Sequence, residues 1–391
     1  MMSSARKRRG QNSQAPKPNA EKENDAPKGP VETFDPRRRS KPRSLLSRCM
    51  NTGKYILFAL FLPPFLNYSA LIREQEIMQP EGDFVDVGEG QKIFINCKGK
   101  GAPTVLLDAG TGMTSDVWEF IQLELARSTR VCVYDRAGLG YSDVPPPGVE
   151  SRWQPYTIET MADNLHQVLQ QKKEIRKPLI LVGAEIGALV ARFYAQMYEV
   201  DILGLVQIEP LVENIFSVDG GVWVQYWYNQ LLMSLQALQF SASIGFTRFA
   251  LIFGMVDQPI TGEFTSSSVK IRQKYLLCQP RHLSVAVDEH YFINNSFSQI
   301  NTLWTMKSFP KNISVTVING NYYDEQLPPE LNRAWAKSQQ HLISNVHPGC
   351  KHIVVNGADR HMLYKNPSSV VNPVLRLVKQ WKHSNREAKK Q

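Results

Sequence analysis

The chain has 391 residues, 42% of them hydrophobic, which is enough for one large globular domain with additional segments. Its formal charge of +9 lies at one end, because residues 1–54 hold 14 of the 45 Lys and Arg residues but only 5 of the 36 Asp and Glu residues, which leaves 31 of each sign elsewhere. The remainder is neutral, so the basic charge gives no reason to expect a nucleic-acid partner. Five cysteines are too few for a scaffold held together by disulfides.

The cysteines differ in their surroundings. Cys132 lies in a strand-like apolar run and is most simply a small buried side chain. Cys97, Cys278 and Cys350 could supply one disulfide, and the sequence leaves their pairing open. Cys49 stands just before a long apolar segment, where an inert thiol is favoured over reversible palmitoylation.

Residues 1–54 form a basic arm rich in Lys, Arg, Pro, Ser and Asn. Large apolar residues are almost missing from it, so burial cannot offset the entropy lost on ordering, and we expect disorder. The next segment, Tyr55–Ile72, has no charged residue in 18 positions and would reach about 27 Å as a helix, close to the hydrocarbon thickness of a bilayer. It is predicted to be a transmembrane signal anchor, with a kink at Pro63–Pro64.

The charges on either side of this segment predict its orientation. The 14 basic residues before it place the N-terminus in the cytosol by the positive-inside rule. The chain is therefore predicted to be a single-pass type II membrane protein whose remaining residues are lumenal or extracellular. Asn-x-Ser sequons at Asn294 and Asn312 are compatible with that side.

Residues 84–382 alternate strand-like and helix-like patterns, which predicts an α/β domain with a mostly parallel, eight-stranded sheet covered on both faces. The expected strands are Phe84–Val87, Lys92–Cys97, Thr104–Asp108, Arg130–Asp135, Leu179–Val182, Gly204–Ile208, Ser314–Ile318 and His352–Asn356. The expected helices are Val117–Ser128, Ile158–Gln171, Ile186–Tyr198, Pro329–Ser344 and Pro367–Lys382.

The alternation is interrupted by one insertion, residues 211–304. Its aromatic cluster, Trp223–Tyr228, and its long apolar helix-like run, Leu231–Phe253, predict a helical cap over the carboxyl edge of the sheet. The aromatic cluster is more simply the core of the cap than a ligand cage. Residues 383–391 are polar and are expected to form a frayed tail.

The stretch from Leu179 to Ala195 combines a buried strand, a tight turn and a helix. Its turn reads Gly183-Ala184-Glu185-Ile186-Gly187, which matches the layout of a nucleophile elbow, G-x-S-x-G, except that Glu185 replaces the serine. The glycines are required by the turn and by helix packing whether or not chemistry occurs, so they support the fold rather than activity.

Five motifs in register resemble the α/β-hydrolase superfamily, in particular its capped members similar to lipases, esterases and epoxide hydrolases. They are VLLDAGTGMTSDVWEF (Val105–Phe120), VCVYDRAGLGYSD (Val131–Asp143), LVGAEIGALVARFYA (Leu181–Ala195), LVQIEP (Leu205–Pro210) and GADRHMLYKNP (Gly357–Pro367). The resemblance implies an α/β-hydrolase fold. In the most specific of these motifs, Asp135 is read as a structural ion pair with Arg136 that steadies the turn.

The resemblance also implies site residues. It places Glu185 at the nucleophile position and His361 at that of the catalytic base, and it makes either Asp324 or Glu209 the acid of the triad. The oxyanion hole would be formed by the backbone N–H groups of Thr111 and Ile186. Neither a metal nor a cofactor is expected.

Glu185 changes the electrostatics that such a site needs. A carboxylate at the elbow favours a resting ion pair with His361, and at a helix N-terminus it can itself occupy the oxyanion hole. We therefore interpret the chain as a membrane-anchored pseudo-hydrolase that binds a small apolar ligand or a protein partner. The alternative is a hydrolase of esters or epoxides in which Glu185 is a carboxylate nucleophile assisted by His361, as resemblance to epoxide hydrolases and dehalogenases with Asp at this turn implies.

Overall fold

The computed structural model describes residues 45–146, 156–321, 324, 327–358 and 361–390, with side chains from Thr52 onward. The chain divides into two units, Met1–Tyr55 and Ile56–Gln391. The disorder predicted for the basic arm falls, over residues 1–44, outside the described residues. Helix α1 (Leu45–Ile77) begins ten residues before the predicted anchor and ends five residues after it, so residues 45–54 are helical rather than part of a disordered arm.

The predicted sheet is confirmed in type and strand number, and each strand lies within two residues of its predicted bounds. Its spatial order is β1-β2-β4-β3-β5-β6-β7-β8; β2 pairs antiparallel with β1 and β4, and all other neighbours are parallel. The strands are β1 (Asp83–Asp86), β2 (Lys92–Lys98), β3 (Thr104–Asp108), β4 (Arg130–Tyr134), β5 (Leu179–Ala184), β6 (Ile202–Ile208), β7 (Ser314–Gly320) and β8 (Lys351–Val355).

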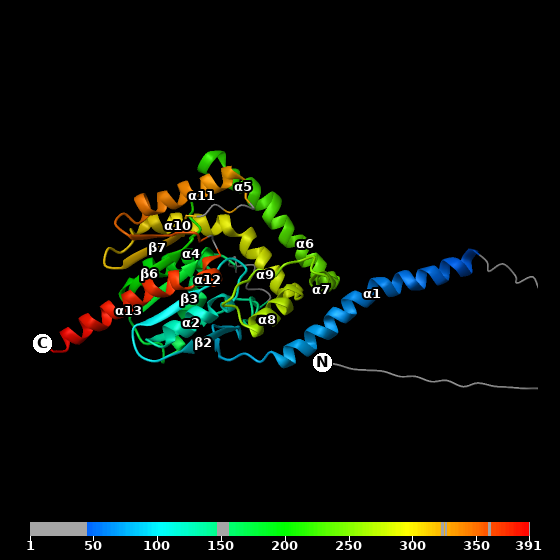
Figure 1. The fold of residues 1–391 in the computed structure, drawn as a ribbon, viewed down its shortest axis with the longest axis horizontal. Coiled ribbons are helices and arrows are strands. Elements are labelled where there is room, and N and C mark those ends of the chain that lie inside the picture. The colour runs from blue at the N-terminus through cyan, green and yellow to red at the C-terminus, as the bar shows by residue number, and fades with distance from the viewer. Residues whose placement is uncertain (1–44, 147–155, 322–323, 325–326, 359–360, 391) are drawn as a thin grey trace, which may run out of the picture. The chain divides into compact units, whose positions relative to one another are not determined.

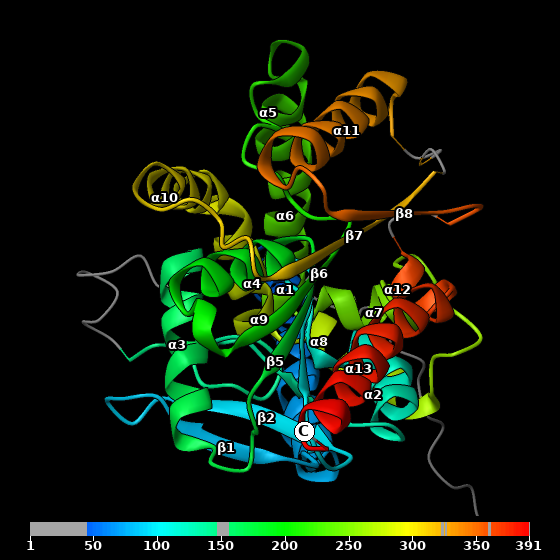
Figure 2. The same ribbon diagram turned by 90° about the vertical axis from the view of Figure 1, so that its left-hand side faces the viewer.

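Helices cover both faces of this sheet, as Figure 2 shows. On one face, α3 (Ile158–Gln171) and α4 (Ile186–Met197) bury an apolar cluster with Leu106 and Leu181. On the other, α2 (Glu119–Ala126) and α13 (Ser368–Ala388) bury a second cluster with Val105, Leu107 and Val182. Successive strand residues thus serve opposite faces, which explains why β3 and β5 read as continuous apolar runs.

Two helix predictions need correction. The run Leu231–Phe253 is not one helix, because Gly245 adopts φ +76° between α6 (Leu232–Ser243) and α7 (Phe246–Ile252). The polar tail is not frayed from residue 383, since α13 continues to Ala388. His383 and Glu387, one turn apart on that helix, lie 3.4 Å from each other at Nδ1 and Oε2.

The remaining helices form the cap and the C-terminal part of the domain. The cap contains α5 (Val222–Tyr226), the π-helix η4 (Trp227–Leu231), α6, α7, α8 (Ser267–Leu277), α9 (Pro280–Tyr291) and α10 (Ile293–Met306). After β7 come α11 (Pro329–His341), the π-helix η5 (Leu342–Val346) and, beyond β8, α12 (Met362–Lys365). Short 3-10 helices occupy Ser115–Trp118 (η1), Glu199–Asp201 (η2) and Val218–Gly220 (η3). Figure 1 shows α6 extending from the α5 end of the cap to α7, with α9 beside it.

Polar contacts join α1 to the cap. The Asn67 side chain is buried and donates to the carbonyl oxygens of Ala242 (3.1 Å) and Cys278 (3.0 Å). Arg248 of α7 donates to Asn67 Oδ1 at 3.0 Å and to both carboxylate oxygens of Glu74 at 2.6 and 2.8 Å. From Asn67 to Glu74, therefore, α1 is part of the folded domain.

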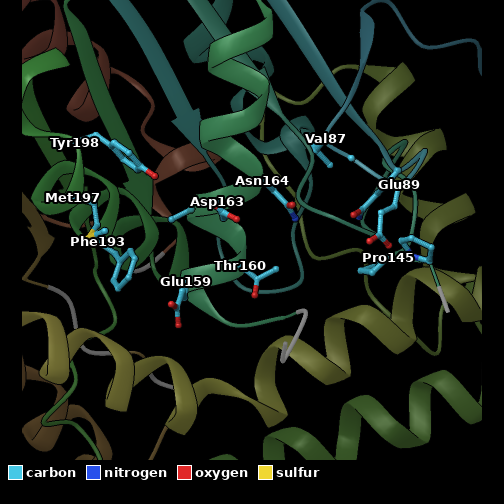
Figure 3. Close-up of a pocket in the computed structure, with 14 residues that line it drawn as sticks. Val87, Glu89, Pro145, Glu159, Thr160, Asp163, Asn164, Phe193, Met197 and Tyr198 are labelled. Carbon is cyan, nitrogen blue, oxygen red and sulfur yellow. The ribbon is translucent and has the colours of Figure 1, made fainter. Parts of the chain in front are cut away.

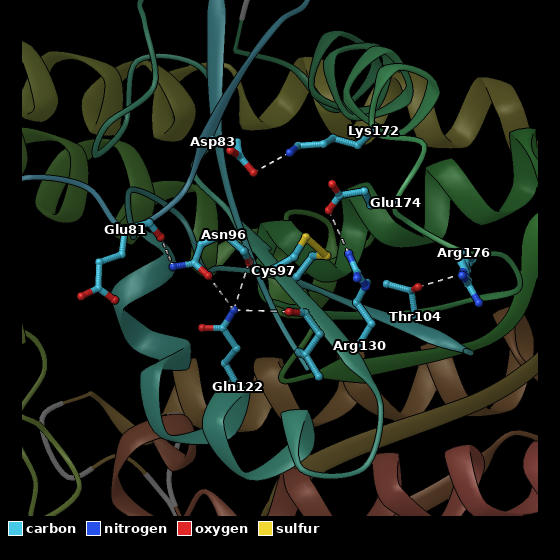
Figure 4. The surroundings of a disulfide bond; sticks show 12 residues. Glu81, Asp83, Asn96, Cys97, Thr104, Gln122, Arg130, Lys172, Glu174 and Arg176 are labelled. Atoms are coloured by element: carbon cyan, nitrogen blue, oxygen red, sulfur yellow. Dashed lines mark hydrogen bonds and ion pairs between the residues drawn. A yellow bond between two sulfur atoms is a disulfide. The ribbon is translucent and has the colours of Figure 1, made fainter. Parts of the chain in front are cut away.

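A disulfide joins Cys97 to Cys132, which face each other across the antiparallel pair β2–β4 (Figure 4). We predicted Cys132 to be simply a small buried side chain, and this is wrong. Cys132 is the disulfide partner of Cys97, whose pairing the sequence left open. Cys278 and Cys350 are free. The two cysteines are 35 positions apart in the sequence, and the segment between them contains β3 and α2.

Replacing Cys97 with Ser should lower the free energy of unfolding by about 2–4 kcal/mol, because the disulfide restricts the unfolded chain. Urea unfolding of the two proteins, both without reductant, measures the difference. The matched control is Cys350→Ser, which removes a free thiol and should have little effect. Peptide mapping that finds Cys97 and Cys132 unlinked in the wild type would contradict the assignment.

Candidate active site

The elbow has the strained geometry that its sequence predicts. Glu185 lies between β5 and α4 with φ +47° and ψ −113°, a conformation that non-glycine residues rarely adopt. Its N–H donates to Ile208 O at 3.1 Å and its carbonyl accepts from Leu211 N at 3.3 Å, so the neighbouring strand and loop hold the turn. A Cβ added at Gly187 would lie 2.5 Å from Ala109 O, so only glycine allows α4 to pack this closely against the β3 loop.

The Glu185 carboxylate is bound by the loop that follows β3. Thr111 N donates to Glu185 Oε2 at 3.2 Å, and a Cβ added at Gly110 would lie 3.0 Å from the same oxygen. Ile186, the other predicted donor, is the first residue of α4, where backbone N–H groups are not used by the helix itself. The side chain at the nucleophile position thus occupies the donor that the resemblance assigned to an oxyanion.

Arg136 fixes the position of this loop. Its guanidinium donates to Ala109 O (2.8 Å) and Gly110 O (2.7 Å), and it pairs with Asp108 (2.6 Å) and with Glu289 of the cap helix α9 (2.7 and 2.9 Å). Both ion pairs are almost fully buried.

Two further hydrogen bonds complete this network. Glu289 Oε2 accepts from Gly112 N at 2.7 Å, so one cap carboxylate binds both the loop and the arginine that supports it. Tyr134 OH donates to Asp108 Oδ2 at 2.6 Å. Asp135, which we predicted to pair with Arg136, instead pairs with Arg272 of α8 at 3.1 Å, so that prediction is wrong.

Burial and the neighbouring charges act in opposite directions on the pKa values of this network. Burial raises the pKa of Asp108, and the neighbouring Arg136 partly opposes the rise. Burial alone would lower the pKa of Arg136, but the carboxylates of Glu289 and Asp108 outweigh it and raise that pKa. Arg136 therefore stays charged, and its two carboxylate partners compensate it.

The two candidate acids differ in surroundings. Glu209 follows β6 with φ +41°, is buried, and accepts from Gly320 N (2.6 Å), Trp335 Nε1 (2.8 Å) and Asn319 Nδ2 (3.3 Å). Asp324 lies after β7, where Asn332 Nδ2 donates to its backbone carbonyl at 3.0 Å. The structure places Glu209, but not Asp324, among the described residues that line the cavity at the elbow.

This cavity has a volume of about 180 Å³ and lies where the cap meets the carboxyl edge of the sheet. It brings together Glu185, Glu209 and His361, three of the residues singled out in the sequence. Aromatic and aliphatic side chains supply most of the remaining lining. The lining residues are Gly110, Met113, Ala184, Glu185, Ile208, Glu209, Leu211, Trp223, Tyr226, Trp227, Leu231, His290, Trp335, His361, Leu363 and Tyr364.

The sequence analysis missed His290, a second histidine at this cavity. Its Nδ1 lies 2.7 Å from Ala286 O, and since a carbonyl only accepts, Nδ1 carries the proton. Burial lowers the pKa of His290, with the Ala286 hydrogen bond and the carboxylates of Glu289 and Glu185 acting in the opposite direction. The aromatic cluster around it, which we read as cap core, both packs in the cap and lines the cavity through Trp223, Tyr226 and Trp227.

Another cavity, of about 530 Å³, lies beside α3 and the end of α4 (Figure 3). Its lining includes the carboxylates of Glu89, Glu159 and Asp163, and neither Glu185 nor His361. It is larger, but it contains none of the predicted site residues. Among the described residues, no group of three His, Cys, Asp or Glu side chains is arranged to hold a metal ion.

Comparison with known proteins identifies the fold class. Residues 103–255 match a family model described as "alpha/beta hydrolase fold". The Cif epoxide hydrolase from Acinetobacter nosocomialis superposes with a TM-score of 0.60 at 15% identity, over 80% of this chain and 96% of that chain. The chain therefore has an α/β-hydrolase fold, as its motifs predicted, and residues 103–255 match the model of that family.

Curated sequence relatives are distant. The "Uncharacterized protein YbdG" of Bacillus subtilis is 26% identical over 230 residues, which cover 57% of this chain and 62% of the relative. The "Uncharacterized vacuolar membrane protein YNL115C" of Saccharomyces cerevisiae is 26% identical over 167 residues, covering 38% of this chain and 22% of the relative. The chain thus spans less than two thirds of the length of each.

Removing Arg136 should be strongly destabilising, because Asp108 and Glu289 would be left as buried carboxylates without a cation. Arg136→Met should lower the free energy of unfolding by about 3–5 kcal/mol in urea titrations. The control Arg127→Met breaks an exposed ion pair with Glu124 and should cost less than about 1 kcal/mol. Equal effects of the two changes would disprove the role given to the network.

A buried histidine should make stability depend on pH. Burial lowers the pKa of His282 to about 4, below its ordinary value of about 6.5, so the unfolded chain binds the proton more readily. The contribution of neutral His282 to the free energy of unfolding is therefore complete above about pH 6.5. It is lost as pH falls toward 4, at about 1.4 kcal/mol per pH unit.

The measurement compares the free energy of unfolding of the wild type and of His282→Gln as a function of pH. Gly140 N donates to His282 Nδ1 at 3.4 Å, and the glutamine amide oxygen can still accept from it. The difference is needed because Asp116, whose pKa burial raises to about 6, acts in the opposite sense. Between pH 6.5 and 4 the wild type should lose more stability than the variant. Parallel curves would show that His282 does not titrate this way.

Proposed function

We propose that this chain is a membrane-anchored α/β-hydrolase-fold protein that binds a small apolar ligand at the elbow cavity and does not turn it over. The observation that carries the proposal is the hydrogen bond from Thr111 N to the Glu185 carboxylate. An oxyanion hole stabilises negative charge that develops on a substrate only in the transition state. Here the side-chain carboxyl of Glu185 already accepts from that donor, so the donor is not available to an oxygen of a substrate.

The cavity supports a small ligand. Its volume of about 180 Å³ is below the roughly 300–1,000 Å³ of sites for drug-sized molecules. Trp223, Trp227 and Leu231 supply an apolar wall from the cap. The Trp223 and Trp227 indole N–H groups are used by Leu331 O and His290 O, so these rings offer their apolar surfaces.

Membrane attachment rests on α1. Within the described residues one helix, Thr52–Ile77, is long and apolar enough to cross a membrane by length and composition. The basic arm before it supports a type II orientation with the hydrolase-like domain in the lumen or outside the cell. The disulfide Cys97–Cys132 supports the same side, since disulfides persist in oxidising compartments.

A second candidate is a hydrolase with Glu185 as nucleophile. It is favoured by the same hydrogen bond, because a carboxylate held by Oε2 in the hole can present its other oxygen to an electrophilic carbon. His361 lines the same cavity and could activate water for hydrolysis of the ester intermediate.

Glu185→Ser tests whether only the nucleophile has been lost. Wild type should not react with fluorophosphonate probes, since these need an activated serine and the elbow offers none. The serine variant should become labelled, because the Thr111 donor is freed and His361 lies at the same cavity. Gel fluorescence after probe treatment measures both, with Glu185→Ala as the control that frees the donor without supplying a nucleophile.

The outcome separates the two candidates. Wild-type turnover of an epoxide or ester that disappears in Glu185→Gln would replace the binding proposal with the carboxylate nucleophile. A folded Glu185→Ser variant that stays unlabelled would mean that the cavity has been reshaped for binding beyond the loss of serine.

A further inference from the structure

The cap carries an exposed apolar corner where α6 ends and α7 begins. Six large side chains form this corner and are exposed to solvent: Phe240, Ile244, Phe246, Ile252, Phe253 and Met255. The two most exposed, Phe253 and Ile252, have 74% and 71% of their surface accessible. Apolar side chains gathered in this way, rather than scattered singly, mark a contact surface.

The corner also lacks charge. Between Gly220 and Val256 the sole charged residue is Arg248. Its guanidinium is half-buried and forms a bidentate pair with Glu74 of α1 at 2.6 and 2.8 Å. The one charge in this part of the cap is thus paired with the carboxylate of Glu74 on α1, an arrangement suited to an environment with few water molecules.

The corner packs directly against that helix. A Cβ added at Gly245, between α6 and α7, would lie 2.3 Å from Pro63 O, so the two backbones touch. One turn later Asn67 donates to Ala242 O and Cys278 O, which satisfies its amide inside the domain. A polar group in an apolar helix at membrane depth needs such protein partners.

The length of the apolar stretch sets the depth of the corner. The uncharged residues run from Tyr55 to Ile72, between Lys54 and Arg73, and reach about 27 Å, just short of a hydrocarbon core of about 30 Å, so they cross it with slight thinning of the bilayer. Their last ten residues, 63–72, include Pro63 and Asn67, which contact the cap. If the stretch crosses the membrane, the cap residues beside it lie at the same depth.

We propose that the α6–α7 corner is embedded in the leaflet through which α1 leaves the bilayer, with the six exposed side chains in contact with lipid. The inference rests on the membrane anchoring under the proposed function and adds a second membrane contact. Lipid is the occupant because the corner continues the exposed apolar surface of α1, where Phe58, Phe61 and Phe65 are also exposed.

Site-specific photocrosslinking tests the proposal on the full chain in phosphatidylcholine vesicles. p-Benzoylphenylalanine replaces Phe253 in one variant and Met255 in a second, so a single misfolded variant does not decide the result. In a third variant p-benzoylphenylalanine replaces Phe58 of α1, and its lipid adduct shows whether the predicted anchor lies in the membrane. Val200, 91% exposed and located in η2 before β6, is the matched control for an exposed apolar side chain away from the cap.

Mass spectrometry of irradiated samples should find phospholipid adducts at positions 58, 253 and 255 and no adduct at position 200. Adducts at 58 with none at 253 and 255 would overturn the embedded corner and leave the anchor standing. No adduct at 58 would overturn both. Covalent dimers at 253 and 255 without lipid adducts would show that a second copy covers the corner, and would also overturn the proposal.

Discussion

A buried guanidinium links the parts of this protein on which the candidate site depends. Arg136 follows β4, holds the carbonyl groups of the β3 loop, and pairs with Glu289 of the cap. Because Glu289 also binds Gly112 N, the loop that contacts Glu185 is fixed from the sheet and from the cap together. Moving the cap would therefore uncover a buried charge, a cost of several kcal/mol that favours a closed cavity.

This rigidity bears on what Glu185 can do. A carboxylate nucleophile must place one oxygen on an electrophilic carbon while the other stays in the hole, and Glu carries one methylene more than the Asp that usually stands in such enzymes. The loop that contacts Oε2 cannot easily shift to make room, since Arg136 and Glu289 hold it. The positive φ of Glu185 is held by the hydrogen bonds of its backbone to Ile208 O and Leu211 N, so the strained turn is fixed as well.

The sequence predicted features that depend on local pattern. Buried strands and the elbow follow from apolar runs and from the glycines at 183 and 187, so their positions were foreseeable. The Cys97–Cys132 pairing was not, because it depends on β2 lying antiparallel to β4. Glu289 and His290 were missed because α9 shows no motif, and only the packing of the cap brings it to the cavity.

The cap connects the cavity with the anchor. Leu231 lines the cavity, and α6 starts at the next residue and runs about 18 Å to Ser243, beside the segment of α1 that contacts Ala242. If the corner lies in the leaflet, as we propose, the cavity is within one short helix of the hydrocarbon region. An apolar ligand would then reach it from the lipid rather than from water, where its concentration is low because transfer of apolar surface into water is unfavourable.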